Sequence, residues 1–279
     1  WTIKNLFELK NARRVLVEGN LFEYHWPQAQ NGYSILFTVR NQEGDAPWSV
    51  VEDVTFRHNV IRHVSDGINI LGLDDNAPSR QSARIAIHNN LFLDVGGDWG
   101  RGRLLQLLRG VEDLSVQNNT AFNTGSIIFA EGAASRRVAI RGNIFMHNDY
   151  GIAGTGTGVG NASLAHYFED LIFTDNVLVG APPGNYPDTN VYPAAAEAVG
   201  FVDRTDGDYR LHTQSPYGEL DEGRPAGRRL RAHLRPPLCA YGAGRNRARG
   251  RRRRLPLGRR PACGGPRPPG RTARGRPSA

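Results

Sequence analysis

One short phrase recurs six times along the chain and constrains its fold more than any other feature. In each copy two apolar residues alternate with other residues and an asparagine follows three positions later, as in Val15, Val17 and Asn20. Alternation with a period of two is typical of a strand with one buried face, and asparagine favours a turn because it tolerates left-handed backbone. Each phrase therefore predicts a strand that ends in a corner. The asparagines are Asn20, Asn59, Asn90, Asn119, Asn143 and Asn176, at intervals of 39, 31, 29, 24 and 33 residues.

A second recurrence lies between these phrases, because a glycine precedes another short apolar strand in five successive units. The glycines are Gly32, Gly67, Gly102, Gly125 and Gly151, and the strands are expected at 34–39, 68–71, 104–108, 127–129 and from 152 onward. Repeats of this length with two or three short strands, and with no amphipathic helical stretch between them, predict an all-β, right-handed parallel β-helix of about six to seven coils. A β-propeller is the main alternative, but its blades are longer and more even.

Stacked coils would bring the six asparagines over one another at one corner. Each side-chain amide would then satisfy the hydrogen-bonding groups of the next, as in other cross-stacked sheets. This structural role is the interpretation we favour for the asparagines over a catalytic one.

Four segments resemble those of bacterial secreted right-handed parallel β-helix repeat proteins of the pectate-lyase-like superfamily. They are 3–12 (IKNLFELKNA), 39–42 (VRNQ), 69–75 (NILGLDD) and 154–160 (GTGTGVG). The resemblance covers about residues 1–217 and implies a secreted or periplasmic protein whose partner is a polysaccharide. It is specific for the fold and much less specific for the chemistry.

The charge of the chain separates a body from a tail. Residues 223–279 contain 18 Arg and no Asp or Glu; subtracting these charges from the total of +8 leaves −10 for the first 222 residues. We expect a β-helix domain over 1–217 and a disordered Arg/Gly/Pro-rich tail over 218–279. The tail has three interpretations: the product of a shifted reading frame in GC-rich DNA, which we favour, a loose appendage, or a binder of nucleic acid or another anionic polymer. It lacks the interleaved aromatic residues of a single-strand platform, so we expect no nucleic-acid partner.

Several classes of protein are disfavoured by what the sequence lacks. Both cysteines, Cys239 and Cys263, lie in the tail, so the body has neither a disulfide framework nor a cysteine-rich metal site. No apolar run is long enough to span a bilayer, and no serine nucleophile elbow, phosphate-binding loop or zinc signature is present. The chain starts in patterned sequence, which favours a processed or truncated N-terminus, and we expect a monomer.

Residues at equivalent positions of successive coils would form columns, and two columns could carry chemistry. The first lies where the second strand leaves the coil: Glu8, Lys10, Arg40, Asn41, Gln42, Asp74, Asp75, Arg109 and Glu131. β-Elimination of a uronate needs a base and positive charge to stabilise the enolate. β-Helix lyases commonly use Lys or Arg as base and Ca²⁺ held by carboxylates, which makes Lys10 or Arg40 the predicted base and Glu8, Asp74 and Asp75 the predicted calcium ligands. Surface ion pairing is the alternative interpretation of the same residues.

The second column lies four residues after each ladder asparagine: Tyr24, His63, Asp94, Asn123 and His147. A His63 side chain beside Asp94 would form an oriented general base. In the following loop, Arg101 and Arg103 are candidates to bind sugar carboxylates, and Asp98 lies beside them. Trp26, Trp48 and Trp99 are candidates for stacking on sugar rings, although corner residues are polar by default and the tryptophans could equally be buried under loops.

The leading functional prediction is a polysaccharide lyase acting on an acidic, uronate-containing glycan. A non-catalytic β-helix that binds glycan or serves as a surface spacer is the alternative from another class. A third alternative is a hydrolase of the polygalacturonase type, but only the Asp74-Asp75 pair resembles the residues that such a hydrolase needs.

Overall fold

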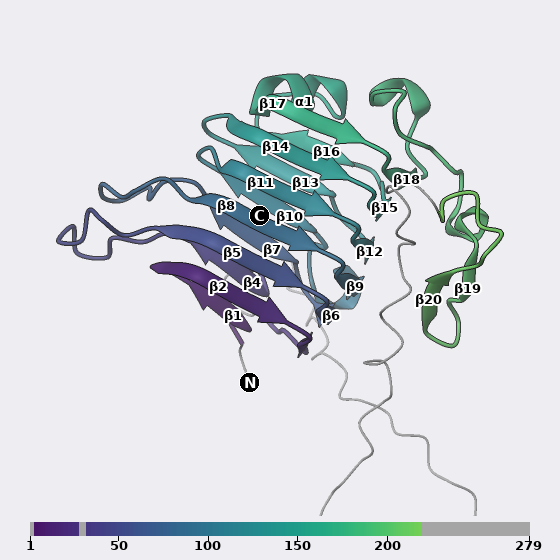
Figure 1. The fold of residues 1–279 in the computed structure, drawn as a ribbon, viewed down its shortest axis with the longest axis horizontal. Coiled ribbons are helices and arrows are strands. Elements are labelled where there is room, and N and C mark those ends of the chain that lie inside the picture. The colour runs from purple at the N-terminus through teal and green to yellow at the C-terminus, as the bar shows by residue number, and fades with distance from the viewer. Residues whose placement is uncertain (1–2, 28–31, 219–279) are drawn as a thin grey trace, which may run out of the picture. The chain divides into compact units, whose positions relative to one another are not determined.

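The computed structural model describes residues 3–27 and 32–218. These residues belong to one compact unit, which spans 1–234; the second unit, 235–279, lies outside them, as does the predicted tail from residue 219 onward. Eighteen of the strands form three parallel sheets of six, and each sheet takes one strand from every coil in chain order (Figure 1). This is the arrangement of a parallel β-helix, and the predicted stacking is confirmed.

We call the three sheets A, B and C in the order in which each coil visits them. Sheet A holds β1 (Phe7–Leu9), β4 (Ile35–Thr38), β7 (Ile68–Leu71), β10 (Leu105–Leu108), β13 (Ile128–Glu131) and β16 (Ile152–Gly154). Sheet B holds β2 (Ala12–Glu18), β5 (Val51–Arg57), β8 (Ala83–His88), β11 (Glu112–Gln117), β14 (Ser135–Arg141) and β17 (Phe168–Thr174). Sheet C holds β3 (Leu21–Glu23), β6 (Val60–Val64), β9 (Leu91–Val95), β12 (Thr120–Asn123), β15 (Ile144–Met146) and β18 (Val177–Val179).

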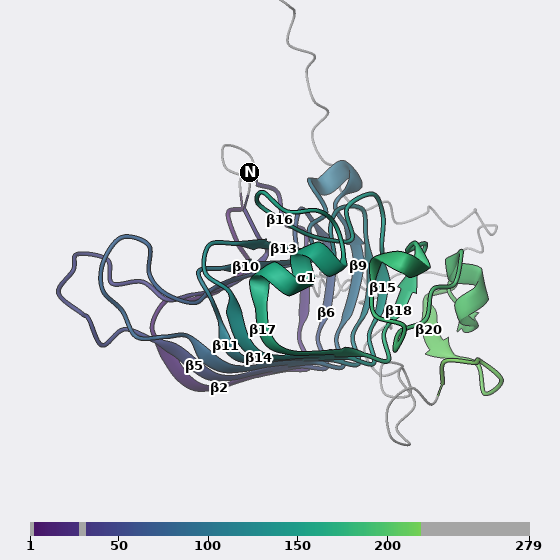
Figure 2. The ribbon, with the colours of Figure 1, turned by 90° about the horizontal axis from the view of Figure 1, so that it is seen from above.

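The three sheets enclose one hydrophobic core. Successive strands lie over one another when seen from above (Figure 2), so the inward residues of each coil pack on those of the next. Ile35, Ile68, Leu105, Ile128 and Ile152, for example, are in register along sheet A and all lie in the core. Their alternation with outward residues is the period-two pattern of the sequence.

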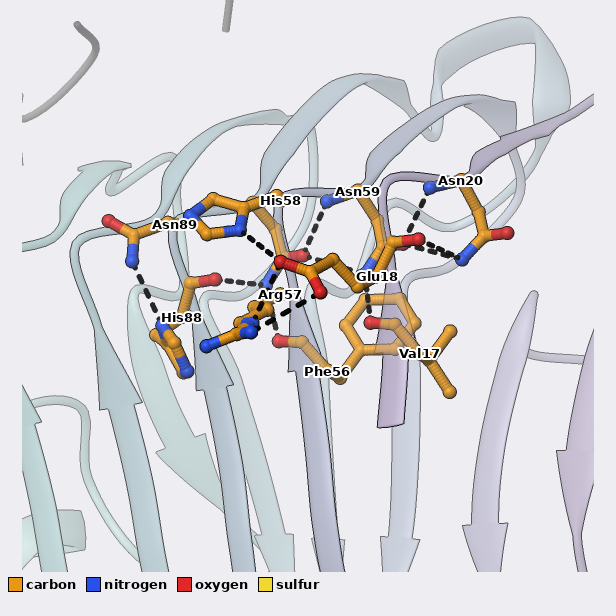
Figure 3. Close-up of polar contacts among 10 residues, drawn as sticks. Val17, Glu18, Asn20, Phe56, Arg57, His58, Asn59, His88 and Asn89 are labelled. Atoms are coloured by element: carbon orange, nitrogen blue, oxygen red, sulfur yellow. Dashed lines mark hydrogen bonds and ion pairs between the residues drawn. The ribbon is translucent and has the colours of Figure 1, made fainter. Parts of the chain in front are cut away.

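The predicted asparagine ladder is present at the corner between sheets B and C. Asn59 Nδ2 donates to the carbonyl of Val17 at 3.0 Å, and Asn59 Oδ1 accepts from Asn20 Nδ2 at 3.0 Å (Figure 3). Asn59 Nδ2 also donates to Asn90 Oδ1 at 3.1 Å. The same bonds continue through Asn119, Asn143 and Asn176. A seventh amide, Asn190, extends the ladder and accepts from Asn176 Nδ2 at 2.9 Å. It was missed because no alternating strand precedes it.

The expectation that no helix interrupts the units is wrong at one place. A short helix, α1 (Asn161–Tyr167), follows the glycine-rich run and packs on β16 and β17, with Leu164 and Tyr167 buried against the core. Gly160, at φ 76°, turns the chain into this helix. The remaining elements are the 3₁₀ turns η1 (Gly97–Trp99), η2 (Pro183–Asn185) and η3 (Ala196–Val199), and the antiparallel strands β19 (Phe201–Asp203) and β20 (Asp208–Leu211).

Candidate functional site

Three polar or aromatic residues lie at or just after the ends of strands of sheet C, at the same corner of the stack. Tyr24, His63 and Asp94 each lie four positions after a ladder asparagine, and each has a left-handed backbone with φ of 64°, 55° and 50°. A left-handed conformation costs a non-glycine residue about 1–2 kcal/mol. The turn at this corner imposes that cost in three successive coils and directs the three side chains to the outside of the stack.

His63 and Asp94 form a hydrogen-bonded pair on adjacent coils. The distance from His63 Nδ1 to Asp94 Oδ2 is 2.7 Å, and the side chains are 32% and 51% exposed. The indole Nε1 of Trp99 also donates to Asp94 Oδ2, at 2.8 Å. No residue within the described ranges hydrogen-bonds to His63 Nε2. Asp94 therefore fixes the ring orientation and leaves the second ring nitrogen available to a ligand.

Aromatic rings surround this pair. Tyr24 stacks on the His63 ring with centroids 5.2 Å apart, and Trp26 stacks on Tyr24 at 5.9 Å. Trp99 contacts His63 at 5.6 Å and Trp26 at 5.8 Å. We call Tyr24, Trp26, His63, Asp94 and Trp99 the corner cluster. All of its rings are partly exposed, so it combines an apolar surface with a polar histidine edge.

The loop that brings Trp99 to the cluster is held by close backbone packing. Gly102 N donates to the carbonyl of Ser65 at 2.8 Å, and Gly97 N donates to Thr124 Oγ1 at 2.9 Å. A Cβ on Gly100 would lie 1.9 Å from Ser65 Oγ, so only glycine allows this approach. The loop that follows β9 is thereby held between Ser65 of the second coil and Thr124 of the fourth.

A buried carboxylate anchors the two predicted arginines beside the cluster. Asp66 is fully buried and accepts from Arg101 Nη2 at 3.1 Å and from the backbone N–H of Arg103 at 2.9 Å. The guanidinium of Arg103 lies 3.8 Å from the centroid of the Phe129 ring on sheet A. None of the carboxylates in the described ranges pairs with the Arg103 side chain, so its charge remains available to an anionic ligand.

Sequence reasoning missed four residues that line the outer face of sheet A next to Arg103. Tyr33 Oη donates to Gln106 Oε1 at 2.8 Å, and Gln106 Nε2 donates to Asn69 Oδ1 at 3.3 Å. Burial and the charge of Asp66 raise the pKa of Tyr33. Asn69, Gln106 and Phe129 are in register on adjacent strands, so the outward positions of the predicted strands were the signal that would have found them.

The predicted column does not continue beyond its third coil. A register shift between Ala121 and Asn123 pairs Asn123 with Val95, so Asn123 turns inward, is 4% exposed and binds backbone carbonyls. His147 is also 4% exposed, and its Nε2 lies 2.8 Å from the hydroxyl of Tyr186. These two residues therefore have structural roles, in place of the surface position expected for them.

The five residues of the first column that were predicted to act in catalysis or metal binding form ion pairs with one another. Lys10 Nζ lies 2.8 Å from Glu8 Oε1, and Arg40 Nη1 lies 2.5 Å from both Asp74 Oδ1 and Asp75 Oδ1. Burial alone would raise the pKa of the Asp74 carboxyl, but the backbone donors of Asn41 and Asn76 and the charge of Arg40 outweigh it and hold that pKa below its ordinary value. This geometry matches the surface ion pairing that was the alternative interpretation.

The arrangement does not fit the predicted calcium ligands. Glu8 pairs with Leu36 on the next strand, and Leu36 pairs with Asn69. Asn69 lies five residues before Asp74, so the carboxylate of Glu8 does not converge with those of Asp74 and Asp75. Among the described residues no group of three or more His, Asp or Glu side chains is placed to hold a metal ion. Calcium binding stays a prediction from the resemblance, and no step below uses it.

Trp48 lies apart from the other two predicted tryptophans. It belongs to the loop between β4 and β5, at the corner between sheets A and B, and is 60% exposed. Trp26 and Trp99 meet at the corner between sheets C and A. A cleft of about 400 Å³ near the first column is lined by the 73–79 loop and Arg109.

Fold and site together define a parallel β-helix with an aromatic corner cluster that presents a histidine and is flanked by arginines. No family model, curated protein or solved structure matches the chain. Within the described ranges no helix is long and apolar enough to cross a membrane.

Proposed function

We propose that the protein is a secreted or periplasmic, right-handed β-helix polysaccharide lyase that cleaves an acidic, uronate-containing glycan at the corner cluster. The observation that carries the proposal is the contact of His63 Nδ1 with Asp94 Oδ2, which leaves Nε2 without a partner among the described residues. The right-handed sense follows from the strong preference of parallel crossover connections for that hand. The resemblance of the sequence to pectate-lyase-like proteins supports the same class.

In this proposal His63 is the base that removes the proton next to the uronate carboxylate. Nε2 takes the proton, the electron pair forms the new carbon–carbon double bond, and the glycosidic oxygen leaves with a proton from solvent. Asp94 stabilises the imidazolium that forms and holds the ring in one orientation, as an acidic partner does for a catalytic histidine. The five predicted catalytic and metal-binding residues of the first column each form an ion pair, so His63 is the better candidate for the base.

Substrate binding is assigned to the aromatic rings and to Arg103. Trp26 and Trp99 offer apolar surface on which sugar rings stack. Arg103, which has no carboxylate partner among the described residues, would bind a uronate carboxylate with two donors. Arg101 is bound to Asp66 and would mainly position the loop.

The experiment is to incubate the protein with polygalacturonate, alginate and glycosaminoglycans, with and without Ca²⁺, and to measure the ultraviolet absorbance of unsaturated products. We expect product with one of them, a rate lowered by at least about 100-fold in His63→Ala, and a smaller loss in Asp94→Asn. Asp98→Asn, an exposed change on the same loop, is the matched control and should retain the wild-type rate.

A non-catalytic glycan-binding protein is the second candidate, because the same rings and arginine would serve binding alone. Equilibrium binding to the same polymers separates the two. Binding that is lost in Trp99→Ala, with no unsaturated product from any polymer, would reject the lyase and support the binding protein.

A further inference from the structure

His25 stands in the sequence between two aromatic residues of the corner cluster, but its own side chain is fully buried. Its Nε2 lies 2.7 Å from the carbonyl oxygen of Lys4. A carbonyl oxygen can only accept a hydrogen bond, so Nε2 carries the ring hydrogen and Nδ1 carries a lone pair. Nδ1 has no hydrogen-bond partner among the described residues. The ring is therefore buried in its neutral form and is held by one hydrogen bond.

This hydrogen bond joins the start of the first coil to residues 24–26, which we call the corner segment. Ile3 N donates to the carbonyl of Trp26 at 3.1 Å, and His25 N donates to the carbonyl of His63 at 3.1 Å. Neither aromatic side chain of the corner segment forms a hydrogen bond within the described ranges. His25 thus supplies the one side-chain hydrogen bond that anchors this segment in the described part of the chain.

The backbone packs closely against the bond between His25 and Lys4. A Cβ added to Gly32 would lie 2.5 Å from the carbonyl oxygen of Lys4 and 3.7 Å from His25 Nε2. Interiors packed this closely give little room for a side chain to move alone. If the ring of His25 has to reach water, the corner segment has to move with it.

The charged groups near His25 leave its Nδ1 without an acceptor. The titratable or charged residues on the elements packed against it are Lys4, Glu23, Tyr24, Arg62, His63, Asp66 and Arg101. Glu23 is paired with Arg62, and Asp66 with Arg101. Burial lowers the pKa of His25, against the raising effects of the bond to Lys4 and of the charge of Asp66. A buried imidazolium whose second N–H meets no acceptor is costly.

We propose that His25 is a positioning residue of the corner cluster that acts as an acid-sensitive latch. While it is neutral, it holds the corner segment so that Tyr24 stacks on His63 and Trp26 stacks on Tyr24. When Nδ1 takes up a proton, the imidazolium moves to water, the bond to Lys4 breaks and both rings leave His63. The release of the rings does not depend on what the cluster binds, whereas the loss of glycan binding that follows from it rests on the proposed function.

The direction of the pH effect follows from the lowered pKa of the folded state. The contribution of such a histidine to stability is fully present above its unfolded pKa of about 6.5 and is lost as the pH falls through the folded pKa. The cluster is therefore assembled at neutral pH and opens in acid.

Near-ultraviolet circular dichroism reports on aromatic rings held in fixed contact, so a pH titration of the full chain tests the latch. We expect the wild-type signal to fall in a transition below pH of about 6.5, with an unchanged far-ultraviolet spectrum. His25→Gln keeps an N–H donor for the carbonyl of Lys4 but takes up no proton, so its signal should persist through that transition.

His63→Gln is the matched control, because His63 is the other histidine in contact with these rings. This variant should still show the transition. A transition in His25→Gln equal to that of the wild type, or one that disappears only in His63→Gln, overturns the proposal.

Glycan binding separates the latch from the function of the site. Affinity for the polymers used above, measured at neutral pH and below the transition, should be lost in acid by the wild type and retained by His25→Gln. Absence of binding to every polymer at both pH values would reject the glycan function, while the near-ultraviolet transition alone decides the latch.

Hydrogen exchange of the wild-type chain decides the same question if His25→Gln does not fold. The amides of Ile3 and His25 donate to the corner segment and to β6, respectively. After correction for the pH dependence of intrinsic exchange, peptides that contain these amides should lose protection below the transition, while peptides from β5 and β8 keep it. Protection that persists in the first coil, or that is lost at the same pH throughout the stack, contradicts the latch.

Discussion

The asparagine ladder makes a quantitative prediction, because its members differ in how many bonds they form. Asn119 is 1% exposed, and its Nδ2 donates to the carbonyl of Ile87 at 2.9 Å, to the carbonyl of Gln117 at 3.0 Å and to Asn143 Oδ1 at 3.0 Å. Its Oδ1 accepts from the backbone N and from Nδ2 of Asn90, both at 3.0 Å. Asn119→Ala removes five hydrogen bonds and leaves buried donors without an acceptor.

Each such bond contributes about 1 kcal/mol net, and a buried group left unsatisfied costs about 1–3 kcal/mol. Because Nδ2 carries only two hydrogens, four of these bonds form at once, and we therefore expect Asn119→Ala to lower the free energy of unfolding by at least about 4 kcal/mol. Asn20, the exposed first member of the ladder, is the matched control. Its side chain only donates, to Asn59 Oδ1 at 3.0 Å and to the carbonyl of Glu18 at 3.1 Å, so Asn20→Ala should cost about 1 kcal/mol or less.

Urea unfolding followed by far-ultraviolet circular dichroism measures both variants against the wild type. The slope of free energy against urea must stay unchanged for the comparison to hold, because stacked repeats can lose cooperativity. Equal losses in the two variants, or a loss near 1 kcal/mol for Asn119→Ala, would refute the idea that the ladder stabilises the stack through its buried bonds.

Two further variants test other parts of the fold. Burial, together with the neighbouring Arg57 and His58, lowers the pKa of His88. Such a histidine stabilises the fold fully above its unfolded pKa of about 6.5, and this contribution is lost as the pH falls through the folded pKa. The urea midpoint of His88→Gln should therefore fall less than that of the wild type between neutral pH and pH of about 5, and an identical fall would contradict this. Gly72→Ala would bring a Cβ within 1.7 Å of the carbonyl oxygen of Gly110, whereas a Cβ at Gly184 would meet no atom within 4 Å. The melting temperature should therefore fall sharply in Gly72→Ala and stay unchanged in Gly184→Ala. Equal melting temperatures in thermal scans would show that the chain relaxes around the added methyl group.

The sequence predicted the stacking of the coils because the signal for it is local and repeated. Alternating apolar residues set the strands, and an asparagine at the same place in each unit set the register between coils. The contact between His63 and Asp94 follows from the same register, since both lie four residues after a ladder asparagine. Their catalytic roles stay predictions.

What the sequence did not reveal depends on departures from the repeat. The register shift in β12 turns Asn123 inward, and nothing in the alternation of its residues indicates a bulge. The ion pairs of Arg40 with Asp74 and Asp75 depend on how the loop after β7 folds back over β4, and Asn41 reaches the same carboxylate through its backbone. Side-chain partners across irregular loops are set by such tertiary contacts, which periodicity does not encode.

The corner cluster combines the regular register of two coils with a loop that departs from the repeat. β6 and β9 are the longest strands of sheet C, at five residues each, and their pairing up to Val64 and Val95 keeps His63 and Asp94 in step. Immediately afterwards, the chain inserts η1 between β9 and β10, and this insertion supplies Trp99. A strictly regular solenoid would present the same polar corner in every coil. Here only two adjacent coils keep the register long enough to pair His63 with Asp94, and only the longer connection places the Trp99 ring beside them, so the repeat supplies the alignment and the irregular loop supplies the aromatic contact.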